Sequence, residues 1–289
     1  MTMTLRLFAA DDDNPFNAYG WSIDLESGSP DLTIDAPAES FPVSSVEVTL
    51  DPWTSWSAEF SPALTDPGLS GASLADLWTD GDTLIASEGD DILRLTEFDD
   101  QATGGYGNDL IDGRGGDDWL RGGADDDVVY GGEGNDRIEG LDGYDALYGG
   151  PGDDIINAGD GAKDTVYGGP GKDVLSDSHA YVFDAELGPT NIDHITKFYE
   201  HQKWTGASVI RLDRDIFGAL KAGKLKGKFL DIGDRKADDR NDYLVYHEKK
   251  GALYYDADGS RKHYDPIKFL ILDNHPQLSR KDFFVFDDS

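Results

Sequence analysis

Aliphatic residues recur every nine positions through the middle third of the chain, and each has an aspartate two positions before it. In nine-residue lines counted from Leu77, the aspartate stands sixth and the apolar residue eighth. Alternate side chains of a strand face opposite sides, so a strand of about three residues needs only one inward apolar side chain. The spacing predicts one short strand per line, with buried side chains at Leu84, Leu93, Ala102, Ile111, Leu120, Val129, Ile138, Leu147, Ile156, Val166 and Leu175.

Glycine occupies two further positions of this frame. It opens the lines at Gly104, Gly113, Gly122, Gly131, Gly140, Gly149 and Gly168. It also stands fourth at Gly89, Gly107, Gly116, Gly134, Gly143, Gly152, Gly161 and Gly171. Because glycine adopts positive φ without steric cost, a tight turn is expected before each strand. The frame is purest from 104 to 157, and one extra residue in "AGDGAKDTVY" shifts the last lines by one position.

Two lines, "GGYGNDLID" (104–112) and "GGEGNDRIE" (131–139), carry every fixed residue of the pattern G-G-x-G-x-D-x-U-x. Residues 77–178 therefore resemble the calcium-binding nonapeptide repeats of the RTX family. The resemblance implies a mainly β fold, in which a right-handed parallel β-roll makes one turn and one strand per line. Two lines complete a coil of eighteen residues, and odd and even lines form two opposed sheets.

The same resemblance implies calcium sites along the edges of the roll. Turns two lines apart share an edge, so Asp109 is expected to face Asp127 and Asp145, and Asp118 to face Asp136 and Asp154. Each Ca²⁺ would take oxygens from two aspartates and from carbonyls of the glycine-rich segments, which suits a hard cation with six to eight ligands. About five to eight ions would fit. The expected metal-site residues are Asp91, Asp100, Asp109, Asp118, Asp127, Asp136, Asp145, Asp154, Asp164, Asp173, Gly107, Gly116, Gly134, Gly143, Gly152 and Gly171.

The negative charge of this region is dense enough that the carboxylates repel one another unless a cation binds between them. The chain has a net charge of −33, of which residues 77–176 carry −19. Such a density opposes compaction, and it argues against binding to nucleic acid or anionic lipid, because both require basic patches. Divalent cations would neutralise most of it, so folding and metal binding are expected to be one event. The competing interpretation, an acidic disordered linker, does not account for the register of aspartate and aliphatic residues.

Residues 179–289 have fewer glycines and more alternating strands. Their motifs are similar to the C-terminal region that follows RTX repeats in type I-secreted bacterial proteins. That resemblance implies strands at 182–184 and 191–195, a helix at 214–220, a hairpin at 251–259 and the tail "DFFVF" at 282–286. It also implies an uncleaved export signal read by an ABC-type exporter, and an extracellular location. Asp256 and Asp258 are interpreted as turn residues rather than a further metal site.

Residues 1–76 are expected to form a small β-rich cap or recognition segment, with strands in "WSIDLES", "LTIDAP" and "SSVEVTL". Trp53, Trp56 and Phe60 are interpreted as core or cap rather than as a sugar-binding platform. Turns are expected at the two Asp-Pro pairs, 51–52 and 66–67. The start, "MTMTLRLFAADDDNP", does not resemble a signal peptide.

Catalytic motifs are incomplete in this sequence. "HEKKG" at 247 lacks the second histidine of a zinc protease, and "GASLA" at 71 lacks the last glycine of a nucleophile elbow. No cysteine is present, and no apolar run approaches the ~20 residues of a membrane helix. We therefore expect a non-catalytic extracellular binding or structural protein. The alternative is a secreted glycan-active or hydrolytic enzyme with an unrecognised N-terminal catalytic unit.

Overall fold

The computed structural model describes residues 89–95, 97–159, 163–199, 207–233, 242–259 and 265–287, together with the backbone of seven strands between residues 3 and 85. The described residues are almost entirely β-strands and turns, with three short 3₁₀ helices. Two compact units divide the chain, residues 1–146 and 147–289. The boundaries expected at 76/77 and 178/179 stay predictions.

The first unit begins with an antiparallel sheet in the order β2-β1-β4. Its strands are β1 (Met3–Ala9), β2 (Tyr19–Leu25) and β4 (Val43–Thr49). β2 and β4 confirm the strands expected in "WSIDLES" and "SSVEVTL", whereas β3 (Asp31–Leu32) overlaps "LTIDAP" only at Leu32. Trp53, Trp56, Phe60 and both Asp-Pro pairs lie outside the described residues.

Parallel pairing starts before the nonapeptide frame. β3, β5 (Ser57–Glu59) and β7 (Thr83–Ile85) pair in that order in one sheet, and β7 continues it to β9 (Gln101–Tyr106). β6 (Ser73–Leu74) pairs with β8 (Ile92–Arg94) in the opposed sheet. The N-terminal segment thus supplies strands to both sheets of the roll, in addition to its own antiparallel sheet.

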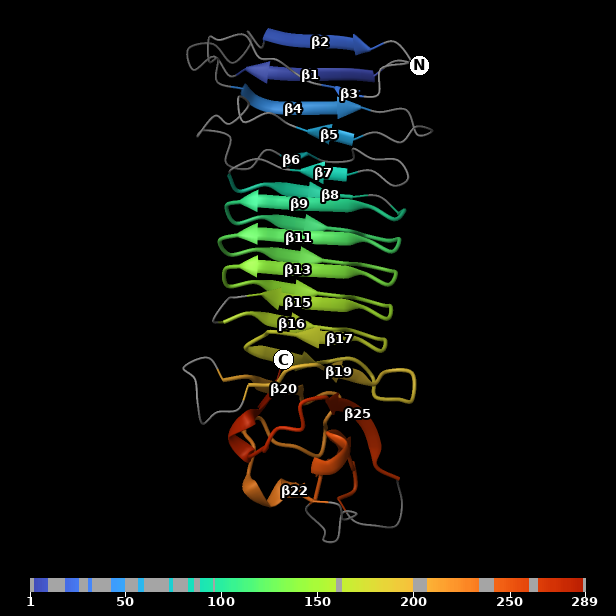
Figure 1. Cartoon of the computed structure of the whole chain (residues 1–289), viewed down its shortest axis with the longest axis vertical. Coiled ribbons are helices and arrows are strands. Elements are labelled where there is room, and N and C mark those ends of the chain that lie inside the picture. Colours follow the sequence, from blue (N-terminus) through green and yellow to red (C-terminus); the bar gives the residue numbers. More distant parts are fainter. Residues whose placement is uncertain are drawn as a thin grey trace. The chain divides into compact units, whose positions relative to one another are not determined.

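The repeats of the first unit form the predicted parallel β-roll. β8, β10 (Leu110–Asp112) and β12 (Val128–Tyr130) make one sheet, and β9, β11 (Trp119–Ala124) and β13 (Arg137–Asp142) make the other (Figure 1). Paired residues are eighteen apart: Ile111 pairs with Leu93 on one side and Val129 on the other. This register confirms that two lines make one coil.

The core of the roll is a single file of aliphatic side chains along each sheet. Each described eighth-position side chain is at most 2% exposed, and these are Leu93, Ala102, Ile111, Leu120, Val129, Ile138, Leu147, Ile156, Val166 and Leu175. Larger side chains lie outside, as with Trp119, which is 37% exposed. One small buried group for every nine residues is little apolar burial for such a glycine-rich backbone.

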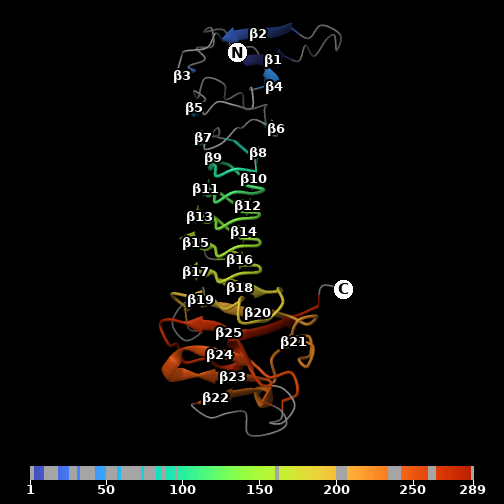
Figure 2. The ribbon, with the colours of Figure 1, turned by 90° about the vertical axis from the view of Figure 1, so that its right-hand side faces the viewer.

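The second unit contains the last repeat strands and the C-terminal region. β15 (Ile155–Gly159), β17 (Val174–Ser176), β19 (Asp193–Ile195) and β25 (Ile267–Leu272) pair in parallel. In the facing sheet, β16 (Thr165–Tyr167), β18 (Ala180–Phe183), β20 (Val209–Asp213) and β26 (Phe283–Phe286) do the same. The C-terminal strands therefore extend the two sheets of the last repeats (Figure 2).

Antiparallel strands and an aromatic cluster complete this unit. β24 (Ala252–Tyr255) pairs antiparallel with β25 and with β23 (Leu244–His247), and β21 (Gly223–Lys224) pairs antiparallel with β26. β22 (Leu230–Ile232) pairs in parallel with β23 at the edge of the sheet. Phe217 makes edge contacts with Tyr255 and Phe269, at centroid distances of 5.0 and 5.1 Å. The larger side chains give this region an ordinary hydrophobic core, which the repeats lack.

Two local expectations in this region have different outcomes. The helix expected at 214–220 is wrong: the segment forms turns, with Phe217 N donating to Asp213 O and Leu220 N to Phe217 O, both at 2.8 Å. A seven-residue segment containing Gly218 is too short and too flexible to propagate a helix. The turn after β24 is confirmed, because Asp256 Oδ1 accepts from the amides of Asp258 and Gly259 at 3.2 Å.

Candidate metal centre

A ladder of side-chain to backbone hydrogen bonds joins the sixth-position aspartates of successive coils. Asp109 N donates to Asp127 Oδ1 at 2.8 Å, and Asp127 N donates to Asp145 Oδ1 at 3.0 Å. On the other edge, Asp118 N donates to Asp136 Oδ1 at 2.9 Å. The structure thus brings together the aspartates that the sequence placed opposite one another. Equivalent bonds join Asp91 to Asp109, Asp100 to Asp118 and, in the second unit, Asp154 to Asp173.

The second carboxylate oxygen of these residues has a different environment. Asp109, Asp118, Asp127 and Asp173 are at most 2% exposed, and Oδ2 of each is buried without a hydrogen-bond partner. A buried carboxylate oxygen with no donor is costly unless a proton or a cation is close to it. Four such atoms at equivalent positions indicate a repeated binding site rather than a local packing defect.

The first-position glycine leaves the space that such a cation needs. A Cβ at Gly104 would lie 2.1 Å from Asp109 Oδ2 and 2.6 Å from the carbonyl oxygen of Gly122. At Gly113 the corresponding distances are 2.4 Å to Asp118 Oδ2 and 2.3 Å to the carbonyl oxygen of Gly131. A carboxylate from one turn and a carbonyl from the next therefore face the same small space. Carboxylate and carbonyl oxygens are the ligands that Ca²⁺ prefers, so these residues fit the ion.

The raised pKa values of the aspartates also indicate that their buried carboxylates are unstable in the charged form without a nearby positive charge. Burial raises the pKa of Asp109 to about 7, against the opposing effect of the hydrogen bond from the Asp91 amide. Burial and, after it, the charges of neighbouring aspartates raise the pKa of Asp118 and of Asp127 to about 8. In the second unit, burial and the Asp193 carboxylate raise the pKa of Asp173 to about 8. Without a cation, the buried carboxylates favour a proton near neutral pH.

The fourth-position glycines have a conformational and packing role. Gly107, Gly116 and Gly134 have φ of 106°, 105° and 135°, where other L-residues are strained. A Cβ at Gly134 would lie 1.9 Å from the carbonyl oxygen of Gly116, one coil earlier. A Cβ at Gly143 or at Gly171 would also lie close to the backbone of a neighbouring coil. Gly152, like Gly143, has a positive φ. These glycines allow the turns to stack at close distance, and their expected ligand role stays a prediction.

Two features of the turns were not predicted from the sequence. The first is that the first-position glycines lie beside Oδ2 of the sixth-position aspartates; their spacing is clear in the sequence, but they were not expected to be part of the metal site. The second is a fifth-position ladder on the exposed side: Asn108 N donates to Asp90 Oδ1 at 2.8 Å, and Asn135 N donates to Asp117 Oδ1 at 2.7 Å. Asp and Asn are frequent at this fifth position, just before the sixth-position aspartate, and this pattern could have predicted the second ladder.

The remaining predicted aspartates occupy equivalent buried positions. Asp91, Asp100, Asp136, Asp145, Asp154 and Asp164 are each at most 5% exposed. Within the residues that the structure describes, no three His, Asp or Glu side chains converge on one point.

Comparison with known families agrees with this geometry. A model of the RTX calcium-binding nonapeptide repeat matches the chain in four copies, at residues 79–95, 94–129, 130–162 and 163–176. Residues 79–176 are therefore RTX calcium-binding nonapeptide repeats. The four matches cover the whole nonapeptide frame from residue 79 onwards. No curated protein matches the chain. In its described part, no helix has both the length and the apolar character needed to cross a membrane.

Proposed function

We propose that this RTX-repeat protein is secreted, binds several Ca²⁺ ions through its repeats and folds as it binds them. The observation that carries the proposal is the set of buried Oδ2 atoms without hydrogen bonds at Asp109, Asp118, Asp127 and Asp173. Each belongs to a turn whose first glycine leaves space beside that oxygen. Bound Ca²⁺ supplies positive charge and links oxygens from successive turns.

The chain's own residues orient the site for that ion. The amide of the preceding coil holds Oδ1 of each aspartate, as Asp109 N holds Asp127, and so directs Oδ2 towards the glycine space. In the absence of cation, successive carboxylates repel one another and the thin aliphatic core opposes unfolding only weakly. Folding therefore depends on calcium in roughly the 10⁻⁴–10⁻³ M range of extracellular modules.

The proposal includes export through a type I (ABC) machinery, with residues 179–289 carrying the signal. Its support is the resemblance of this region to the C-terminal region of type I-secreted proteins. In the cytosol, where calcium is low, the repeats would stay unfolded and pass through the exporter; outside the cell they would bind calcium and fold. The folded protein then acts as a non-catalytic binding or structural protein, with residues 1–76 as its cap or recognition segment.

A calcium titration of the EDTA-treated full chain, followed by far-UV circular dichroism, tests the central claim. We expect a cooperative gain of β signal with calcium, and no comparable gain with magnesium at matched ionic strength. A spectrum unchanged by calcium, in protein shown to be metal-free by elemental analysis, would mean that the fold does not depend on the ion.

Export is tested separately by co-expression with a type I exporter. The full chain should appear in the medium, and a chain ending at residue 178 should stay in the cells. Equal export of both chains would place the signal elsewhere.

A further inference from the structure

The aspartate ladder continues one step past the last nonapeptide repeat. Asp173 N donates to Asp193 Oδ1 at 3.1 Å, in the same way as Asp154 N donates to Asp173 Oδ1 at 2.9 Å. Asp193 is only 4% exposed, and it lies seventeen positions after the RTX match ends at residue 176. In the structure, this residue thus occupies the place of a repeat aspartate without belonging to a repeat.

An unpartnered buried atom points to a ligand at this step. Asp173 is fully buried, its Oδ2 has no hydrogen-bond partner, and a Cβ at Gly168 would lie 2.2 Å from that oxygen. One turn earlier, the space at Gly149 is bounded by Asp154 Oδ2 at 2.2 Å and by the carbonyl oxygen of Gly168 at 2.5 Å. The space at Gly149 is therefore closed by the turn one coil later. For Asp173, the segment that follows is 184–193.

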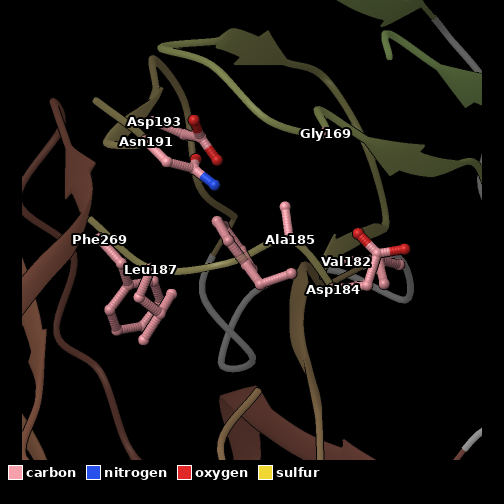
Figure 3. Close-up of a pocket in the computed structure, with 9 residues that line it drawn as sticks. Gly169, Val182, Asp184, Ala185, Leu187, Asn191, Asp193 and Phe269 are labelled. Carbon is pink, nitrogen blue, oxygen red and sulfur yellow. The ribbon is translucent and has the colours of Figure 1, made fainter. Parts of the chain in front are cut away.

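A cavity lies where this segment meets the last glycine-rich turn. Its lining includes Gly169 from that turn, Asp184, Ala185 and Leu187 from the segment, and Asn191 and Asp193 at its end. Figure 3 shows the Asp193 and Asn191 side chains next to each other at this cavity, with Ala185 across from them. Asn191 Nδ2 donates to the carbonyl of Glu186 at 2.8 Å, which closes the segment into a loop. A carboxylate from Asp193 and an amide oxygen from Asn191 thus lie beside the last repeat.

We propose that a divalent cation of the Ca²⁺ class binds between Asp173 and Asp193, with further oxygens from the loop 184–191. This inference rests on the proposed calcium binding of the repeats and adds a site that the repeat pattern does not contain. The segment "DAELGPTNID" has a single glycine and makes the coil twenty residues long, so the nine-residue frame cannot identify it. Because Asp193 begins β19, whose neighbour is β25, the ion would fasten the C-terminal region to the last repeat.

The substitution Asp193→Asn tests this site in the full chain. An asparagine oxygen can still accept the hydrogen bond from Asp173 N, so the fold should be preserved while the carboxylate is lost. We expect equilibrium dialysis with ⁴⁵Ca at saturation to show one ion fewer than in the wild type. The matched control is Asp215→Asn, an exposed residue of the same unit, which should keep the full number.

The outcomes separate this inference from the proposed function. A wild type that binds no calcium would overturn both, whereas an Asp193→Asn variant that binds as many ions as the wild type would overturn only the terminal site. A crystal structure of the calcium-loaded wild type decides the question if the variant does not fold. We expect an ion within about 2.3–2.6 Å of carboxylate oxygens of Asp173 and Asp193. Ions in the repeats but none at this position would refute the proposal.

Discussion

The amide of Asp109 donates to Oδ1 of Asp127 at 2.8 Å, and Oδ2 of the same carboxylate is buried without a hydrogen bond. The two oxygens of this carboxylate therefore differ: one accepts a backbone hydrogen bond and the other accepts none. The backbone of the preceding coil fixes Oδ1, and Oδ2 is the oxygen that we propose binds a cation. The arrangement explains why an aspartate, whose short side chain has little freedom, recurs at this position.

Asp118 and Asp117 provide a matched pair for testing this division. Asp118 is buried with Oδ2 unpartnered, whereas Asp117 is exposed and accepts from Asn135 N at 2.7 Å. We expect Asp118→Asn to weaken calcium binding, with a midpoint raised roughly tenfold, because a ligand charge is lost. Asp117→Asn keeps a hydrogen-bond acceptor and should change the midpoint little. Isothermal titration calorimetry measures both, and equal effects would contradict the assignment of the sixth position.

Gly104 tests whether the space beside the carboxylate matters. In Gly104→Ala the new Cβ would lie 2.1 Å from Asp109 Oδ2, so the oxygen must move out of its position. We expect a severalfold higher calcium midpoint in the circular dichroism titration. Gly218→Ala is the control, since Gly218 is exposed and its nearest atom to a Cβ is Arg214 O at 3.8 Å. A Gly104 variant indistinguishable from wild type would show that the space is not used.

The raised pKa values predict an unusual pH dependence for the metal-free protein. Asp118 and Asp127 have a pKa of about 8 in the folded state, against an ordinary value of 3.8. Between these values the folded state binds more protons than the unfolded state, so the free energy of unfolding falls as pH rises. In EDTA, we expect more β signal at pH 5 than at pH 8.

Calcium should reverse this trend, because it competes with protons for the same oxygens. The calcium affinity is expected to rise by roughly tenfold or more between pH 6 and pH 8, with proton release on binding near pH 7. Calorimetry in buffers of different ionisation enthalpy measures the released protons. Affinity that is independent of pH across this interval would show that the buried aspartates are already ionised.

The aliphatic file is tested by Ile138→Ala in the calcium-loaded protein. Ile138 is fully buried, so its truncation should lower the free energy of unfolding by about 2–5 kcal/mol. Ile155 is 48% exposed, and Ile155→Ala should have a much smaller effect. Urea unfolding at fixed saturating calcium gives both values. Similar losses would indicate that burial at the eighth position does not stabilise the roll.

The sequence predicted the parts of the fold that depend on a strict period. Asp109 and Ile111 lie where the nine-residue frame placed them, because every coil of the frame repeats the same turn and strand. Asp193 was not predicted as a site residue because its coil is twenty residues long and the segment before it has a single glycine, Gly188. The helix expected at 214–220 rested on the resemblance to other C-terminal regions, and a resemblance of short motifs does not fix the local conformation, which here is a series of turns. The ligand role of the predicted site residues stays a prediction.

The unequal coils at the end of the repeats have a consequence for alignment. Bonded aspartates are eighteen residues apart from Asp91 to Asp145, but nineteen apart for Asp154 and Asp173, and twenty for Asp173 and Asp193. Where coils are equal, sliding the chain by one coil places aspartate against aspartate and glycine against glycine again, so strand register is weakly specified. A coil of different length cannot be superposed on its neighbours in this way. In an ordinary core, varied side chains specify which strands pair and in which register. In this repetitive chain, coils of unequal length specify the register instead.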